Sequence, residues 1–244
     1  LDRFKRAHAL SAAAGKPALQ AVSAAWLAHL AYVRIDLETM AKHLTVAFSI
    51  STNADSFARS RACLVVAQAL HHASRPEPAS VWYERARGHA LAESDDAALS
   101  AMMYNMTGIR VAHLRQATLT GVDPHGQGKL PLASVESVLN YDSLVGVASL
   151  SSYLPLLRAQ VHSLEGRPDL ALALYEEHIR EATAHQGQSH LEGYLLADRA
   201  WCLVDLGRIE EGLAGAAQAE HCLDAETQPD ERAATRSRLA QIHA

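Results

Sequence analysis

The sequence predicts an all-α fold in which pairs of antiparallel helices stack one on another as a solenoid. Small residues recur at near-constant intervals of 39, 41, 51 and 41 positions, which is the length of two helices with their turns. Apolar residues between them follow the helical period, and no run of alternating β-branched residues indicates a sheet. The recurring small residues are Ala28, Ala67, Gly108, Ala159 and Ala200.

Each unit contains a second helix, because a further set of residues follows the first at an offset of 12 positions. Small side chains at paired positions let two helix backbones approach closely. We therefore expect these residues at the crossing inside each hairpin. They are Met40, Ala79, Ala171 and Gly212.

Turn and cap residues separate six expected helices in the first half of the chain. Gly15 ends the first helix, and Pro17 opens the second. Asp55 caps the fourth helix, two prolines within 75–78 precede the fifth, and Asp96 suits the positive end of the sixth. The expected ranges are about 1–14, 17–34, 36–49, 55–72, 79–92 and 95–119.

The second half begins with the segment GVDPHGQGKLP at 121–131, predicted as an inserted loop that lengthens one interval to 51 residues. Gly166 and Gly207 mark turns between later helices, expected at about 132–145, 151–164, 168–183, 190–206, 209–223 and 229–244. In pairs, the helices predict a single domain over residues 1–244 with truncated repeats at both ends. Its hairpins are expected at about 17–51, 55–94, 95–147, 151–185 and 189–224.

Composition excludes several classes of partner. A net charge of −5 gives no reason to expect nucleic acid, and no apolar run reaches the roughly 18 residues of a membrane span. The three cysteines, Cys63, Cys202 and Cys222, are scattered without a CxxC pair, which is typical of reduced thiols. We therefore expect a cytoplasmic protein that binds neither nucleic acid nor membrane.

The segment Leu156–Glu177 resembles a tetratricopeptide repeat (TPR), with Ala159, Gly166, Ala171 and Tyr175 at the family's small and large positions. The segments Leu196–Ala219 and Ser60–Ala86 repeat this arrangement. The units are near 40 residues rather than the standard 34, which resembles the long-unit bacterial members of the superfamily. The resemblance implies a right-handed α-α superhelix of about twelve helices.

By this resemblance, the first helix of each hairpin lines a concave groove that suits a peptide or a partner helix. The alternative is that each residue merely packs one helix against the next, and the sequence leaves both interpretations open. The candidate groove residues are His29, Tyr32, Gln68, His71, Asn105, Tyr153, Arg158, Gln160, Tyr194, Arg199 and Trp201.

Two of these residues, Arg158 and Arg199, occupy the same repeat position. Stacked on successive repeats, they could clamp a carboxylate or a phosphate. The competing interpretation, which we favour, is a salt bridge from each arginine to Glu165, Asp198 or a neighbouring acid.

The sequence favours a non-catalytic protein–protein interaction scaffold. The alternative is a ligand- or partner-sensing regulatory domain of a larger bacterial signalling or transcription-regulating protein. No nucleophile motif or metal-ligand spacing is present, so we expect no enzyme activity, no metal and no cofactor. His71 and His72 are adjacent on a helix and point about 100° apart, which disfavours a shared metal ion. Exposed solenoid ends could pair as a homodimer.

Overall fold

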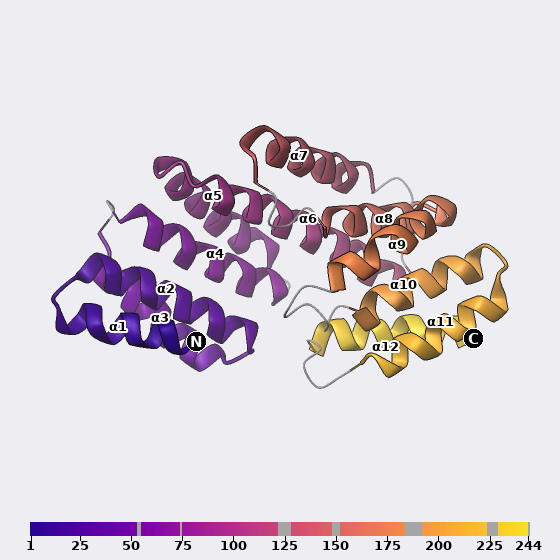
Figure 1. The fold of residues 1–244 in the computed structure, drawn as a ribbon, viewed down its shortest axis with the longest axis horizontal. Helices are drawn as coiled ribbons and strands as arrows, with labels where there is room; N and C mark the ends of the chain where they lie inside the picture. Colours follow the sequence, from indigo (N-terminus) through magenta and orange to yellow (C-terminus); the bar gives the residue numbers. More distant parts are fainter. Residues whose placement is uncertain are drawn as a thin grey trace. The chain divides into compact units, whose positions relative to one another are not determined.

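The computed structural model describes residues 1–52, 55–73, 75–121, 128–147, 152–183, 192–223 and 229–243 (Figure 1). These residues form twelve α-helices and no strand, which confirms the all-α prediction. The helices are α1 (Asp2–Ala13), α2 (Pro17–Val33), α3 (Leu37–Ile50), α4 (Ser56–His72), α5 (Pro76–Ala92), α6 (Asp96–Leu119), α7 (Lys129–Val145), α8 (Leu154–Leu164), α9 (Pro168–Thr183), α10 (Glu192–Asp205), α11 (Ile209–His221) and α12 (Pro229–His243).

The chain divides into two compact units, and the division falls within α6. Unit 1 comprises Leu1–Asn105, and unit 2 comprises Met106–Ala244. Each unit is described by itself below. A single domain over the whole chain therefore stays a prediction.

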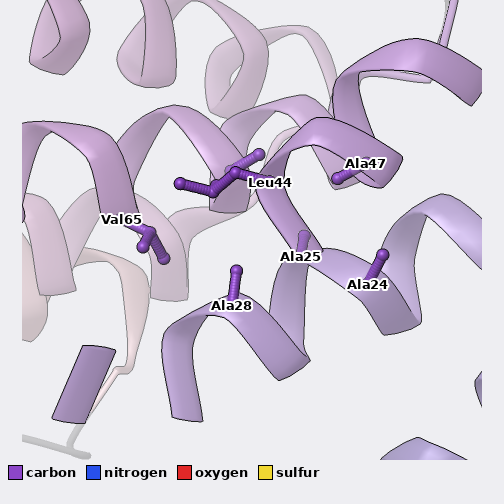
Figure 2. Close-up of a cluster of buried hydrophobic side chains, with 7 residues drawn as sticks. Ala24, Ala25, Ala28, Leu44, Ala47 and Val65 are labelled. Carbon is purple, nitrogen blue, oxygen red and sulfur yellow. The ribbon is translucent and has the colours of Figure 1, made fainter. Parts of the chain in front are cut away.

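In unit 1, α2 packs against α1, α3 and α4, and α4 packs in turn against α5 (Figure 1). Because alanine dominates this core, the helix backbones approach closely and no large ring separates them. The side chains of Figure 2 converge from three helices on this crossing. The core residues are Ala24, Ala25 and Ala28 of α2, Leu44 and Ala47 of α3, and Ala62 and Val65 of α4.

In unit 2, the helices α8 to α11 pack in chain order, each against the next, and α12 packs against both α10 and α11. The crossing of α10 and α11 is built on glycine. A Cβ added to Gly212 would lie 2.6 Å from Cγ2 of Val204, and one added to Gly215 would lie 3.2 Å from Cβ of Ala200. This crossing therefore admits no larger side chain without movement.

Most of the recurring small residues occupy buried positions, as their spacing predicts, whereas Gly108 and Met40 are partly exposed. Ala28, Ala67, Ala159 and Ala200 have no exposed surface. Their partners twelve positions on, Ala79 and Ala171, are equally buried, and Gly212 is buried as well. The approximately forty-residue period thus marks contacts between helices.

A second repeated feature lies in the turns between helices. At the ends of α1, α2, α5, α7, α8 and α10, a residue with positive φ is followed by an N–H that donates to the carbonyl five residues before it. This hydrogen bond belongs to the Schellman motif, in which the left-handed residue is usually glycine. Four of these turns use glycine, but Ile35 (φ 59°) and Ser94 (φ 53°) take its place in the other two. The six donors are Lys16, Asp36, Asp95, Val147, Arg167 and Arg208.

Two helices begin earlier than the sequence predicts. α5 begins at Pro76 rather than near residue 79, and α7 begins at Lys129 rather than near residue 132. The N–H groups of a first helical turn have no acceptor within the helix, so the prolines at 76, 78 and 131 fit there. Residues 122–127 of the expected loop, and the hairpin ends expected at 151, 185, 189 and 224, lie outside the described residues.

Candidate functional site

The eleven predicted groove residues divide between the two units. His29, Tyr32, Gln68, His71 and Asn105 lie in unit 1, and the other six lie in unit 2. Of the eleven, four are buried, the other seven are partly exposed, and none is fully exposed. A common groove stays a prediction, and each unit is considered separately. The buried four are Gln68, His71, Tyr153 and Gln160.

In unit 1, five rings form a continuous row across α1, α2 and α4, which we call the aromatic row. Phe4 stacks on Trp26 with ring centroids 5.5 Å apart, and Trp26 meets His29 edge-on at 5.8 Å. His29 lies 6.5 Å from Tyr32, which meets His72 at 5.9 Å. The residues on α2 are neighbours because positions three apart share one helix face.

Arg61 of α4 lies over the ring of Trp26, with its guanidinium carbon 4.1 Å from the ring centroid. A cation placed over the face of tryptophan is held by the ring's negative potential. Burial, and to a lesser extent the charge of Arg61, lowers the pKa of His29 from 6.5 to about 4. The middle of the aromatic row therefore holds a neutral imidazole at physiological pH.

The two adjacent histidines of α4 contact different helices. His71 is buried and lies edge-on to Tyr83 of α5 at 5.8 Å, whereas His72 is exposed and contacts Tyr32 of α2. Gln68, one turn before His72, is buried, and its Oε1 has no hydrogen-bond partner in the described part of the chain. Of these predicted residues, Gln68 and His71 are therefore part of the packing between helices.

In unit 2, a buried ion pair joins helices that are far apart in the chain. Nε of Arg115 on α6 donates to both carboxylate oxygens of Asp198 on α10, at 2.9 and 3.1 Å. Nη2 of Arg115 donates to Oδ1 of Asp198 at 2.7 Å. Arg238 of α12 brings its Nε within 3.4 Å of the same Oδ1. All three side chains are at least 95% buried.

Two predicted groove residues lie under these guanidinium groups. The guanidinium carbon of Arg115 is 4.2 Å from the ring centroid of Tyr194, and that of Arg238 is 4.9 Å from the ring of Trp201. We call these five residues, Arg115, Asp198, Arg238, Tyr194 and Trp201, the arginine cluster. Tyr194 and Trp201 therefore contact the chain's own arginines in this structure.

The sequence prediction overlooked the charged residues of the arginine cluster. Arg115 and Arg238 were not singled out, and Asp198 was considered only as a partner for the exposed arginines. A signal was present, because Asp198 stands among apolar residues in the segment YLLADRAW of α10. A lone charge on the apolar face of a helix requires a partner of opposite charge when it is buried.

Arg158 and Arg199 each pair with an acid on a neighbouring helix. Arg158 lies 2.9 Å from Glu136 of α7, and Arg199 lies 3.2 Å from Glu176 of α9. Both pairs are partly exposed, so each contributes little to stability. The structure thus shows the salt bridges of the competing interpretation, and Asp198 is not among the partners of Arg199.

The remaining predicted residues differ in their surroundings. Tyr153 is buried and its Oη donates to the carbonyl of Ala182 at 3.2 Å, which ties the start of α8 to the end of α9. Gln160 is buried within α8, and Asn105 is partly exposed at the last position of unit 1. Tyr153 and Gln160 therefore belong to the core of unit 2.

The described residues contain neither a metal-binding cluster nor a helix that could span a membrane. No three histidine, cysteine, aspartate or glutamate side chains of the described ranges gather closely enough to hold a metal ion. Among the helices that the structure describes, none combines the length and the apolar character that crossing a membrane requires.

The two units offer different chemistry for binding. The aromatic row presents partly exposed rings, which bind apolar and aromatic side chains. The arginine cluster presents buried guanidinium groups, which bind anions. Comparison of the chain with protein-family models, with curated proteins and with solved structures gives no match.

Proposed function

We propose that this chain is a non-catalytic scaffold of the TPR-like superfamily that binds a peptide or a partner helix. The observation that carries the proposal is the aromatic row of unit 1, whose rings come from three helices and remain partly exposed. The long-unit superhelix is part of the proposal.

Packing between neighbouring helices supports a repeat architecture. In unit 1, α2 packs against both its hairpin partner α3 and the first helix of the next hairpin, α4. In unit 2, α10 packs in the same way against α11 and α12. A helix that contacts its own partner and the next unit is typical of stacked hairpins, where each repeat is stabilised by its neighbours. The Schellman turns shared by six helices support the same interpretation.

The aromatic row has the properties of a binding surface for a peptide. Tryptophan and tyrosine contribute most strongly to protein interfaces, because they bury a large area and lose little side-chain freedom. Trp26 is already held between Phe4 and Arg61, and Tyr32 between His29 and His72. Rings fixed in this way lose less entropy when a partner binds.

Peptide binding by the aromatic row is tested by selecting binders from a library of random dodecapeptides displayed on phage. The affinities of selected peptides are then measured for the wild type and for Tyr32→Ala. We expect Tyr32→Ala to weaken binding about tenfold or more, because a ring at an interface centre contributes about 2 kcal/mol or more.

The matched control is Val81→Ala, which truncates an exposed side chain on α5 of the same unit. It should leave the affinity unchanged. Circular dichroism of each variant establishes that unit 1 remains folded. A library without enriched peptides, or enriched peptides that bind Tyr32→Ala and wild type equally, would refute binding at the aromatic row.

A further inference from the structure

The arginine cluster of unit 2 contains a hydrogen-bond donor that its own carboxylate does not reach. Nε and Nη2 of Arg115 both donate to Asp198, so Nη1 lies on the guanidinium edge that faces away from that carboxylate. Nη1 is shielded from solvent and has no hydrogen-bond partner among the described residues. Leaving a buried cationic donor without an acceptor is costly, and in native proteins it commonly indicates a bound water or ion.

A second donor without an acceptor lies close to Arg115. Tyr175 of α9 is completely buried, and its Oη also has no partner within the described part of unit 2. Burial raises the pKa of Tyr175 well above its ordinary value of 10, so the hydroxyl keeps its proton. Tyr175 interacts electrostatically with Arg115, Asp198 and Tyr194. Two buried donors that interact electrostatically thus both lack an acceptor.

The charges of the cluster favour an anion as that acceptor. Two guanidinium groups, those of Arg115 and Arg238, contact the single carboxylate of Asp198. Asp205 is the next acid near Arg238, but it is exposed to solvent. The buried part of the cluster therefore carries an excess of one positive charge. Burying an uncompensated charge is unfavourable, and a bound monovalent anion would compensate it.

The position of the anion follows from the donors that have no acceptor, and its small size follows from their burial. Tyr194 covers one face of the Arg115 guanidinium, and the edge with Nη1 is the one that Asp198 does not reach; Nη1 and Oη of Tyr175 are both shielded from solvent. We infer that unit 2 contains a buried site for one small monovalent anion, of halide or formate size, bound by Nη1 of Arg115 and Oη of Tyr175. Charge-assisted hydrogen bonds from guanidinium and phenol hold such an anion without any change in protonation. The site is independent of peptide binding by unit 1.

The site is tested by melting the full chain in sodium chloride, sodium formate or sodium gluconate at constant ionic strength. Gluconate serves as the reference anion, because it is too large for a closed site. We expect chloride or formate to raise the melting temperature by roughly 3–5 °C over gluconate, since a ligand that binds only the folded state stabilises it by RT ln(1 + [L]/Kd). Chloride and formate are compared to separate a halide site from a carboxylate site.

The decisive variant is Tyr175→Phe, which removes the hydroxyl and leaves the ion pair of Arg115 and Asp198 intact. This variant should abolish the difference in melting temperature between the small anions and gluconate. The matched control is Tyr83→Phe in unit 1, because Tyr83 is also buried with an unpartnered Oη but has no arginine of the cluster beside it. Tyr83→Phe should keep the full difference.

Three outcomes would overturn the inference. Equal melting temperatures of the wild type in all three salts would show that no small anion binds. An anion effect that persists in Tyr175→Phe would place the anion elsewhere, and its loss in Tyr83→Phe would do the same. Crystals grown in bromide provide a direct readout, with an anomalous peak expected between Nη1 of Arg115 and Oη of Tyr175.

Discussion

Arg115 and Asp198 form a two-pronged ion pair across 83 residues of chain, with Nε and Nη2 of the arginine at 2.9 and 2.7 Å from Oδ1 of the aspartate. The pair joins α6 to α10, and Arg238 extends it to α12. Asp198 is the carboxylate that both arginines contact. The folding of unit 2 should therefore depend strongly on this one side chain.

Asp198→Asn should destabilise the chain by about 3–5 kcal/mol, because it removes the carboxylate charge that both buried guanidinium groups contact. Unfolding in urea, followed by tryptophan emission, to which Trp201 beside the cluster contributes, measures the effect. The matched control is Glu176→Gln, which breaks the partly exposed pair with Arg199 and should cost less than about 1 kcal/mol. If Asp198→Asn and Glu176→Gln lost similar amounts of unfolding free energy, the predicted dependence of unit 2 on Asp198 would be wrong.

Gly212→Ala should destabilise unit 2 by about 1–3 kcal/mol, because the added methyl group overpacks the crossing of α10 and α11. The new Cβ would lie 2.6 Å from Cγ2 of Val204 and 3.2 Å from the carbonyl oxygen of Ala200. Valine is branched at Cβ and has little freedom to rotate away. Thermal melting gives the measurement.

Gly88→Ala is the control for Gly212→Ala, since Gly88 lies within α5 and a Cβ there would meet nothing within 4 Å. Alanine at that position should stabilise the chain by about 0.5–1 kcal/mol through helix propensity alone. If both substitutions moved the melting temperature in the same direction, the tight crossing would not be the cause.

Ile35→Gly should stabilise unit 1 by about 1 kcal/mol. Ile35 takes the left-handed conformation (φ 59°) that is unfavourable for a β-branched residue and natural for glycine. Its side chain is 48% exposed, so its removal costs little buried surface. Ile35→Val is the control, because it retains the backbone strain and should leave the midpoint of urea unfolding unchanged. If both variants raised the midpoint, relief of this strain would not be the cause of the stabilisation.

Stability should fall as the solution is acidified through the range from about pH 6.5 to pH 4. The pKa of His29 is about 4 in the folded chain, against 6.5 for an unperturbed histidine, chiefly because of burial. The unfolded chain therefore binds the proton first, and the stability conferred by neutral His29 is fully present above pH 6.5 and lost below it.

The loss attributable to His29 between about pH 7 and pH 5 is at most about 2 kcal/mol. Urea unfolding at the two pH values measures it, and His29→Gln should show a correspondingly smaller decrease. The titration of other groups is common to both proteins and cancels in this comparison. Identical decreases in the wild type and His29→Gln would rule out the assignment to His29.

Much of the helical structure could be predicted, because its causes are local. Helix ranges followed from apolar period, caps and breakers, each of which acts within a few residues. The helices that began early show the limit of this reasoning. Pro76 and Pro131 were interpreted as breakers, yet both lie within first turns, where proline is tolerated. Ile35 and Ser94 likewise form turns that the sequence does not mark with glycine.

The candidate sites were predictable only in part. His29 and Tyr32 follow from the tetratricopeptide resemblance, which places both at inward positions of one helix, and the structure brings their rings together there. Phe4 and Arg61 were not, although they cover the ring of Trp26, because they come from other helices. The apolar periodicity of one helix does not predict which side chains of other helices will contact it.

From the amino-acid sequence alone we could establish that the chain is helical and that small residues about forty positions apart lie at buried helix contacts, as Ala28 and Ala159 do. These are properties of a single helix and its nearest neighbour. The meeting of Arg115, Asp198 and Arg238 was decided by the folded chain. A buried charge is stable only beside a partner, and which helix supplies that partner depends on how several helices pack at once.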